Sequence, residues 1–323
     1  MKAPTVTGVT DRRPTVSVLL TVKDGLPYLK PAVASILAQT FADFEFVVVD
    51  DASTDGSREF LEQAAASDPR IVLRRNERNL GPGESSNRGL AVCRGEWVAR
   101  IDADDVAVPV RLERQLAFMR DNPDVHATSC LAWFIDAAGR RTGRTVSDAM
   151  TREQFRHLRE HNLPIGILHP GAFIRRDVLA AVGGYHSAFD PPSDIDLWCR
   201  ISDEHLILVQ RERLMEYRIH DVSISASRYE HTRLKSIWAR DCMIARREGR
   251  DEPSWESFLE DRRSAPWWLR LNRWRKMCAK RLYRQSAQHY VAARHATSMR
   301  EIMLAVLLQP EYALPRLKAQ IFG

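Results

Sequence analysis

The chain has 323 residues, of which 44% are hydrophobic and 28% charged, a balance typical of a globular protein with one large domain or two ordinary ones. Its five cysteines are scattered without Cys-x-x-Cys spacing, which argues against a zinc ribbon and a disulfide framework. No apolar run approaches the roughly 20 residues of a membrane-spanning helix, and the first residues have no signal-peptide core. We therefore expect a cytoplasmic protein that begins with a flexible segment, residues 1–13.

The formal net charge of +6 is distributed unevenly along the chain. Residues 262–300 contain eleven Lys and Arg and no Asp or Glu, whereas the rest has 37 bases against 42 acids. Two regions of opposite charge predict two different tasks.

Short apolar runs rich in β-branched residues alternate with apolar positions at helical spacing through the first hundred residues. This alternation predicts an α/β fold whose parallel strands are joined by right-handed crossovers. A stretch rich in Gly, Asn and Ser, residues 76–87, is expected to be a loop. The predicted strands are 16–22, 44–49, 71–73 and 97–101, and the predicted helices are 28–37, 57–66 and a short one ending at 90–93.

Acidic residues follow three of the predicted strands. The first strand ends at residues 21–24 (TVKD), the second at 50–57 (DDASTDGS) and the fourth at 102–105 (DADD). Ligands of such sheets bind beyond the carboxyl ends of the strands. One edge of the sheet should therefore gather carboxylates from separate strand ends.

The crowding of Asp102, Asp104 and Asp105 has two interpretations. Mg²⁺ or Mn²⁺ would offset the repulsion, because hard cations take oxygen ligands and complete their shells with substrate phosphates. Alternatively, the residues form a solvated loop with a helix cap before Pro109. A second acidic strand end favours the metal–nucleotide interpretation, in which Asp51 would accept a hydrogen bond from a base or a ribose.

Three segments between Pro14 and Ser225 resemble family 2 glycosyltransferases with the GT-A fold, and they occur in the order found in that family. They are PTVSVLLTVKDGLPYLKPAVASILAQTFADFEFVVVDDASTDGS, NLGPGESSNRGLAVCRGEWVARIDADD and HPGAFIRRDVLAAVGGYHSAFDPPSDIDLWCRI. The resemblance implies a mainly parallel central sheet flanked by helices, followed by a mainly helical C-terminal extension. It also implies transfer of a sugar from a nucleotide donor with inversion at the anomeric carbon.

The resemblance implies roles for individual residues as well. Asp51 would bind the nucleobase, Asp102 would contact the ribose or the metal, and Asp104 would be the direct ligand of Mn²⁺ or Mg²⁺. The Tyr-Arg-x-His pattern that ends at His220 is similar to the family's segment near the diphosphate, which makes His220 a candidate metal or diphosphate ligand. UDP is the default nucleotide from the resemblance alone, with dTDP and GDP left open. The expected nucleotide-binding residues are Thr21, Asp24, Asp51, Asn79, Gly81, Asn87 and Asp102.

Inverting transfer needs a base that takes the proton of the acceptor hydroxyl. Asp194 is the candidate, since it matches the second member of the family's Glu-Asp pair, although its position equally fits a helix N-cap. Ser193 replaces the Glu of that pair, and Lys23-Asp24 replaces an aromatic-Asn pair at the first strand end. The Gln-x-x-Arg-Trp motif of processive members is missing, which favours a non-processive enzyme. Ser193, Asp196 and Trp198 are the candidate acceptor-binding residues.

The C-terminal region combines bases with Trp267, Leu271 and Trp274 at helical spacing. This pattern fits an amphipathic helix that binds an anionic membrane surface through residues 262–300, and it equally fits a helix that packs its apolar stripe on the catalytic domain. Nucleic acid is not expected as a partner, because only this region is basic and no RNA-binding motif is present.

The leading hypothesis is therefore a metal-dependent, inverting transferase. It would move a sugar to a glycan or a lipid-linked acceptor in surface polysaccharide assembly, from the cytoplasm or the inner face of the membrane. Two alternatives remain: a sugar-nucleotide pyrophosphorylase or other nucleotidyltransferase, and a non-catalytic protein that binds membranes or nucleic acid. The expected regions are a catalytic domain, 14–227, with a nucleotide-binding half, 14–105, and an acceptor-binding half, 106–227, then a basic helical region, 228–323.

Overall fold

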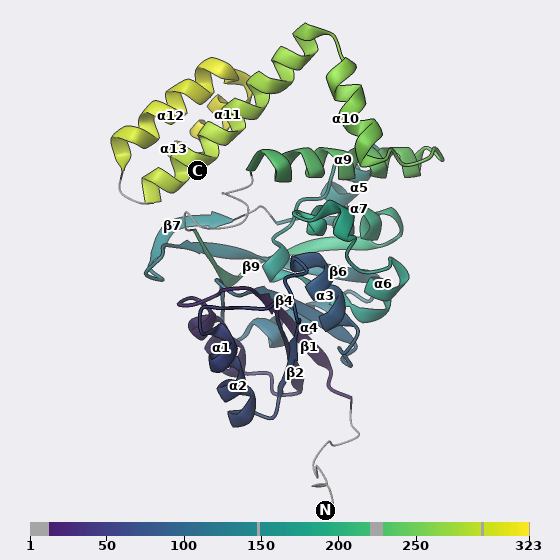
Figure 1. Ribbon diagram of the computed structural model, residues 1–323, viewed down its shortest axis with the longest axis vertical. Coiled ribbons are helices and arrows are strands. Elements are labelled where there is room, and N and C mark those ends of the chain that lie inside the picture. Colours follow the sequence, from purple (N-terminus) through teal and green to yellow (C-terminus); the bar gives the residue numbers. More distant parts are fainter. Residues whose placement is uncertain (1–12, 147–148, 220–228, 292–293, 323) are drawn as a thin grey trace, which may run out of the picture.

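The computed structural model describes residues 13–146, 149–219, 229–291 and 294–322. A nine-stranded sheet flanked by helices forms the lower part of the molecule, and helices α9 to α13 lie above it (Figure 1). The strands are ordered β3-β2-β1-β4-β8-β6-β9-β5 across the sheet, with β7 paired to β6.

The first half of the sheet is parallel, as the strand–helix alternation predicts. β1 (Val16–Val22) pairs in parallel with β2 (Phe44–Asp50) and with β4 (Trp97–Asp102), and β2 pairs in parallel with β3 (Ile71–Arg75). Nearly every residue of β1 and β2 is buried, because helices cover both faces of this part of the sheet. The connecting helices are α1 (Leu29–Leu37), α2 (Ser57–Ser67) and α3 (Pro82–Leu90).

Helix α3 replaces part of the loop expected at residues 76–87. Pro82 begins the helix, where its missing N–H is not needed. Ser85, Ser86 and Gly89 are buried, and a Cβ atom on Gly89 would lie 2.3 Å from the side chain of Leu19. The helix packs closely on the sheet through small residues, so its sequence lacks the apolar stripe that predicts a buried helix.

The second half of the chain makes the sheet mixed. β8 (Phe173–Arg175) is antiparallel to β4 and β6, and β9 (Leu206–Arg218) is parallel to β6 and antiparallel to β5. The other strands are β5 (Val106–Ala107), β6 (Val125–Ile135) and β7 (Arg141–Val146), and the helices are α4 (Arg111–Asp121), α5 (Arg152–Glu160), α6 (Arg176–Ala181) and α7 (Ser193–Glu204).

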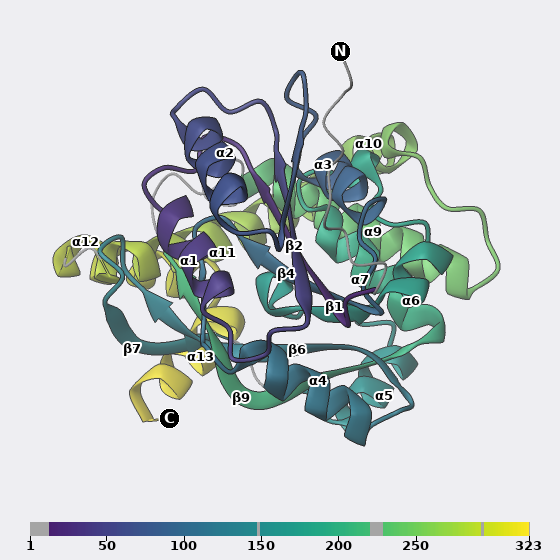
Figure 2. The same cartoon turned by 90° about the horizontal axis from the view of Figure 1, so that it is seen from below.

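Apolar layers lie on both faces of the sheet. Figure 2 shows α1 and α2 on one side and α3, α6 and α7 on the other. Leu61 of α2 and Met119 of α4 belong to the first layer, whereas Leu179 of α6 and Trp198 of α7 belong to the second. The sheet is thus fixed from both sides, which holds its strand ends in place.

The expected helical C-terminal region is confirmed for the described residues. It consists of α9 (Tyr229–Arg247), α10 (Trp255–Ser264), α11 (Trp267–Val291), α12 (His295–Leu308) and α13 (Pro310–Phe322). A third apolar cluster joins α9 and α10 to Phe189 in the catalytic part. Arg246 and Arg247 of α9 each lie 2.7 Å from an oxygen of Asp203 at the end of α7. Helix α9 is therefore attached by both apolar and charged contacts.

Gly95 provides a test of this packing. It is buried between α3 and β4, its N–H donates to Ser17 Oγ at 2.8 Å, and an added Cβ would lie 2.5 Å from the backbone N of Ser17. We expect Gly95→Ala to lower the free energy of unfolding by about 1–3 kcal/mol through overpacking. Urea denaturation measures the change. Gly166→Ala is the matched control, because no atom lies within 4 Å of its added Cβ. Equal stability of the two variants would contradict the packing described here.

Candidate active site

The strand register brings the acidic strand ends together. Asp102, the last residue of β4, lies beside Thr21 of β1, and Asp50 of β2 lies beside Val22. Each of Asp102, Asp104 and Asp105 offers a carboxylate oxygen within 4.8 Å of the other two. The predicted gathering of acids at one sheet edge is thus present in the structure.

Two buried arginines lie beneath this acid cluster, which comprises Asp102, Asp104 and Asp105. Arg100 Nη2 donates to Asp102 Oδ1 at 3.1 Å, and its Nη1 donates to the carbonyl of Leu19 at 3.1 Å. Arg111 Nη2 donates in turn to the carbonyl of Arg100 at 2.7 Å. Burial lowers the pKa of Arg111 to about 10, so it remains a cation at neutral pH. These positive charges partly offset the repulsion among the acids.

Asp105 is the most deeply buried member of the cluster. Its Oδ1 accepts from the backbone N–H of Arg218 at 2.8 Å, whereas its Oδ2 has no hydrogen-bond partner among the described residues. Burial, followed by the charges of Asp104 and Asp102, raises the pKa of Asp105 well above its ordinary range. A buried oxygen without a partner is costly, and a proton or a cation would satisfy it.

The donor set of the acid cluster fits a hard divalent cation. All three side chains offer carboxylate oxygens, which Mg²⁺ and Mn²⁺ favour over nitrogen or sulfur. Burial is also the largest cause that raises the pKa of Asp102, and Arg100 opposes the rise. His220, the remaining expected ligand, lies outside the described residues.

Arg218 holds the acidic loop from the other side, a role that the sequence does not reveal. Its Nε donates to the carbonyl of Asp104 at 2.7 Å, and its Nη1 donates to the carbonyl of Asp136 at 2.8 Å. The guanidinium also stacks 4.7 Å from the ring centroid of Tyr28. Because Asp104 is 114 residues away in sequence, no local pattern could predict the contact.

Asp51 organises the loop that leads into α3. It is buried, and its Oδ1 accepts from Asn76 Nδ2 and from the N–H of Leu80, both at 2.8 Å. Its Oδ2 accepts from the N–H of Gly81 at 3.0 Å, a group that Asn79 Oδ1 also approaches at 3.0 Å. The carboxylate therefore fixes the start of α3 against β2, and contact with a nucleobase stays a prediction.

Asp24 joins the tips of β1 and β2. Its carboxylate accepts from the N–H of Thr54 at 2.6 Å, and this bond is the main cause that lowers the pKa of Asp24. Lys23 Nζ lies 3.1 Å from the same carboxylate. The pair that replaces the family's aromatic-Asn therefore bridges two loops at the edge where Thr21 lies.

Asn87 makes hydrogen bonds inside the protein, and its contact with a nucleotide stays a prediction. Its Nδ2 donates to the carbonyl of Tyr185, and its Oδ1 accepts from the N–H of Tyr185, both at 2.8 Å. Both ends of the amide are used in joining α3 to the turn after α6.

Asp194, in the first turn of α7, lies within electrostatic range of Asp102. Burial raises the pKa of Asp194 to about 6, and the charge of Asp102 adds to the rise. The negative charges of Asp194 and Asp102 both contribute to raising the pKa of the Tyr185 phenol. The structure thus brings the predicted base close to the predicted metal ligands, on a different element from theirs. An N-cap role is not observed, since α7 begins at Ser193 and Pro192 is its cap residue.

Two candidate acceptor-binding residues on α7 point into the protein. Trp198 is fully buried in the second apolar layer, with the ring of His169 edge-on at 5.7 Å. Asp196 is buried as well, and its Oδ2 lies 2.7 Å from Arg200 and 3.3 Å from His186. Burial alone would raise the pKa of Asp196, but these two partners hold it below its ordinary value. The geometry gives both residues structural roles in place of acceptor contacts.

Ser193 and Asp190 lie where the starts of α3 and α7 meet. Asp190 Oδ2 accepts from the N–H of Gly83 at 2.8 Å, and a Cβ on Gly83 would lie 3.0 Å from Ser193 Oγ. Burial raises the pKa of Asp190, with Ser193 and Gly83 opposing the rise. Sequence reasoning missed Asp190, although an Asp directly before Pro191-Pro192 at a helix start is a signal that could have found it.

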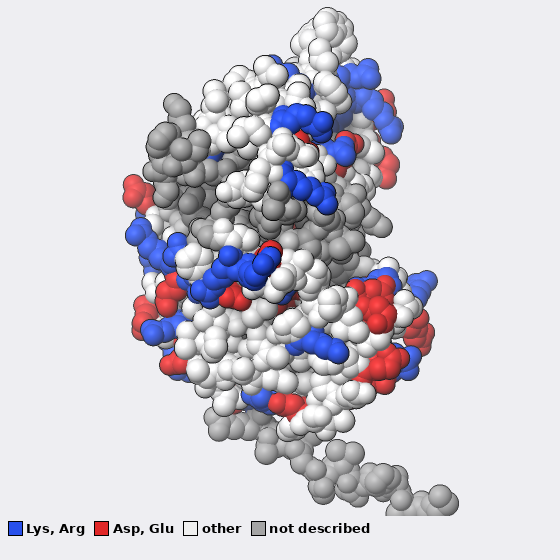
Figure 3. Space-filling view, turned by 90° about the vertical axis from the view of Figure 1, so that its left-hand side faces the viewer, with Lys and Arg blue, Asp and Glu red and all other residues white. Residues whose placement is uncertain are grey.

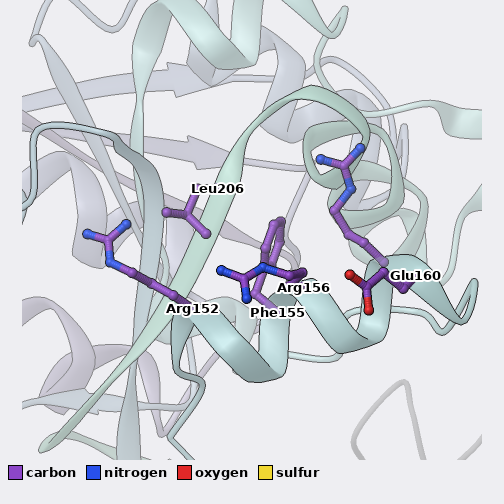
Figure 4. Close-up of a pocket in the computed structure, with 6 residues that line it drawn as sticks. Arg152, Phe155, Arg156, Glu160 and Leu206 are labelled. Carbon is purple, nitrogen blue, oxygen red and sulfur yellow. The ribbon is translucent and has the colours of Figure 1, made fainter.

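A separate hollow of about 530 Å³ lies beside α5, and it contains no predicted site residue (Figure 4). Two of its three arginines have structural partners: Arg152 pairs with Asp124, and Arg159 donates to the carbonyl of Asp203 at 2.6 Å. The acid cluster with Asp194 is therefore the better candidate for an active site. The residues lining the hollow are Arg152, Phe155, Arg156, Arg159, Glu160 and Leu206.

A mixed sheet whose parallel strand ends gather acids near Asp194 is consistent with the class of glycosyltransferases, and the comparisons show the family. Residues 17–183 match the model of "Glycosyl transferase family 2". An uncharacterised glycosyltransferase of Methanocaldococcus jannaschii is 30% identical over 230 residues, or 70% of this chain and 78% of the relative. The protein belongs to glycosyl transferase family 2, which favours a sugar transferase over a nucleotidyltransferase or a non-catalytic binder.

The chain is also similar to a further curated relative and to two solved structures. The putative teichuronic acid biosynthesis glycosyltransferase TuaG of Bacillus subtilis is 36% identical over 35% of this chain and 45% of its own. The crystal structure of S. aureus TarS with UDP-GlcNAc has a TM-score of 0.58 at 17% identity and covers 92% of both chains. The mannosyltransferase PcManGT from Pyrobaculum calidifontis, solved with GDP-Man and Mn²⁺, has a TM-score of 0.55 at 20% identity and covers 96% and 81%. These likenesses confirm the expected GT-A fold.

The raised pKa of Asp194 can be measured directly. We expect carboxyl-carbon NMR of the metal-free protein in EDTA to give a pKa of about 6 for Asp194, against an ordinary 3.8. In Asp102→Asn the pKa of Asp194 should fall, because a like charge is removed, without returning to 3.8, because burial remains. Asp121→Asn, an exposed change on α4, should leave it unaltered. An unchanged pKa in Asp102→Asn would refute the electrostatic contact.

Proposed function

We propose that this family 2 glycosyltransferase is an inverting enzyme that transfers a sugar from a nucleoside diphosphate donor to an acceptor hydroxyl with Mn²⁺ or Mg²⁺. The observation that carries the proposal is the position of Asp194. It approaches the acid cluster from a different element, and its pKa of about 6 suits a base near neutral pH.

The acid cluster would hold the cation and the donor diphosphate. Asp104 and Asp102 are the proposed ligands, and the Oδ2 of Asp105, which has no hydrogen-bond partner among the described residues, lies beneath them. A bound cation would supply charge stabilisation for the departing diphosphate. Arg100, Arg111 and Arg218 keep the carboxylates in position without occupying all their oxygens.

The nucleoside would lie along the tips of β1, β2 and α3. Thr21, Asp24 and Asp51 come from the first two strand ends, and Asn79 and Gly81 come from the loop that Asp51 fixes. The Oδ2 atom of Asp51 would accept the base N–H, since it accepts only one bond from the described residues and so has a second lone pair.

Inversion follows from a single displacement. The acceptor oxygen attacks the anomeric carbon as the bond from that carbon to the diphosphate oxygen breaks, and the hydroxyl proton passes to Asp194. Because Asp194 is partly desolvated, its carboxylate is a stronger base than an exposed Asp would be.

The substrate assignment rests on the related proteins. UDP is the default nucleotide, supported by the UDP-GlcNAc complex of TarS, and GDP is the rival, supported by the GDP-Man complex of PcManGT. Relatives named for teichuronic acid, O-antigen and succinoglycan biosynthesis support a glycan or lipid-linked acceptor of surface polysaccharide assembly.

Nucleotide calorimetry tests the donor site. We expect one of UDP, GDP and dTDP to bind in the presence of Mn²⁺, and its affinity to fall at least about tenfold in EDTA and in Asp104→Asn, because a charged ligand is lost. Asp121→Asn removes one exposed carboxylate elsewhere and should bind like the wild type. Metal-independent binding, or no binding by protein shown to be folded, would contradict the site.

Asp194→Asn tests the base. We expect kcat to fall by about 10²–10⁴-fold while nucleotide affinity is retained, since an amide cannot accept the proton. In the wild type, the base works only when ionised. Activity should therefore be present above the pKa of Asp194 and be lost as the pH falls below it.

The pH profile of kcat/KM checks this sign. Its acid limb should lie at or below pH 6, because a cation bound near Asp102 would stabilise the ionised form of Asp194. A wild-type profile without an acid limb, or full activity of Asp194→Asn, would exclude Asp194 as the base.

A further inference from the structure

We propose that the N-terminal part of α11 docks the protein on a bilayer surface rich in anionic phospholipid. The docking surface is the Trp face, defined by Trp267, Trp268, Leu271 and Trp274. Their exposed fractions are 70%, 57%, 53% and 60%, although side chains of this size are normally covered. Among the described residues, every exposed large hydrophobic side chain lies between Trp267 and Leu314.

The spacing of the Trp face places it on one side of the helix. Positions separated by three, four and seven residues share a face at 100° per residue, and Trp268 lies at its edge. By the same rule, Arg270 lies beside Trp274 at one edge of this face and Arg275 lies beside Trp268 at the other edge. An apolar stripe bordered by cations is the arrangement of helices that lie in a membrane interface.

The alternative that α11 packs its apolar stripe on the catalytic domain fails for this part of the helix. Packing of that kind is made by α9 and α10 instead: the rings of Trp238 and Phe189 stack at 4.0 Å, and Trp255 lies 5.3 Å from Trp238. The C-terminal region therefore contains both tryptophans that pack inside the protein and tryptophans that face outward. Trp238 is 7% exposed, whereas the tryptophans of the Trp face are more than half exposed.

The positive charge of this region favours an anionic partner. Residues 262–300 contain eleven bases and no acid, and seven of those bases lie on α11. Figure 3 shows one side of the molecule, on which most of the acidic side chains lie over the lower, catalytic part. Each Lys or Arg near an anionic lipid surface adds attraction, and Trp is favoured at the boundary between headgroups and acyl chains.

A second copy of the chain fits this surface less well. A two-fold contact would place the Trp face and its bordering arginines against the same cations of the partner. A lipid surface offers both the negative charge and the apolar layer. In the part of the chain that the structure describes, no helix is long and apolar enough to span a bilayer, so the docking proposed here is interfacial.

The other end of α11 lies toward the acid cluster. Arg284 acts electrostatically on Tyr217, as do Asp102 and Asp105. With a rise of about 1.5 Å per residue, the Trp face lies about 15–26 Å along the helix from Arg284. Docking would therefore fix how the catalytic part is oriented on the lipid surface. The inference requires no transfer reaction, so it stands or falls separately from the proposed function.

Vesicle flotation tests the docking. We expect the wild-type protein to float with phosphatidylcholine vesicles that contain about 30% phosphatidylglycerol, to float poorly with phosphatidylcholine alone, and to dissociate as salt rises from about 0.1 M to 1 M. The triple variant W267A/W268A/W274A should lose at least about tenfold in partition coefficient. The charge reversal Arg270→Glu with Arg275→Glu should lose a similar factor.

Matched controls separate local from general effects. Arg120→Glu with Arg211→Glu makes the same change in net charge at two exposed positions of the catalytic part, and it should float like the wild type. Unfolding curves of all variants should coincide, because the altered side chains are exposed. Nucleotide affinity, measured on the same samples, reports separately on the transferase site.

Three outcomes would overturn the inference. The folded wild type could fail to float with anionic vesicles, or the triple Trp variant could float as well as the wild type. Light scattering could also show a concentration-dependent dimer that the triple variant abolishes while neither protein binds vesicles. That last result would assign the Trp face to self-association.

Discussion

The geometry of the site depends on the neutralisation of crowded carboxylates by buried arginines. Arg100 of β4 holds Asp102, Arg111 of α4 holds the backbone of Arg100, and Arg218 at the end of β9 holds the backbone of Asp104. An unpaired buried charge of either sign would be very costly, so each group requires the others. Three elements far apart in sequence are thereby fixed around one short loop. The loop presents its carboxylate oxygens at a fixed edge of the sheet, as a site for a cation demands.

The same balance gives two nearby acids on α7 opposite properties. Asp194 faces the negative charge of Asp102, and burial with that charge raises its pKa to about 6. Two residues later, Asp196 is more deeply buried than the half-buried Asp194, but His186 and Arg200 hold the pKa of Asp196 below its ordinary value. The two environments therefore suit Asp194 to proton transfer and Asp196 to a structural role. Arg200, the partner of Asp196, also donates to the carbonyl of Gly184 and so fixes the Gly183-Gly184 turn.

Sequence patterns predicted the elements whose signals are local. Strand β1 and helix α1 follow from continuous apolar runs and helical spacing, and the register of β1 with β4 accounts for Asp102 lying beside Thr21. A short helix ending at 90–93 was predicted, but most of α3 was expected to be a loop because it packs through small residues. The internal contacts of Asn87 with Tyr185 were missed because they join segments 98 residues apart. The burial of Trp198 could have been predicted from the sequence, because Leu197, Trp198 and Ile201 share a helical face and that face is the buried one. Asp194 lies one turn before them on the same face and is half-buried.

The tryptophans of the chain differ in exposure between the packed elements and the surface of α11. Trp97, Trp198 and Trp238 are buried in three separate apolar clusters, and Trp133 and Trp255 are half-buried. The three tryptophans of α11, each more than half exposed, therefore differ from every other tryptophan of the chain. The departure coincides with the one long segment that carries bases and no acids. Exposed apolar side chains alone would favour aggregation, and positive charge alone would favour binding to any polyanion. Both features on one helix face favour a lipid surface, which has anionic headgroups above an apolar acyl layer.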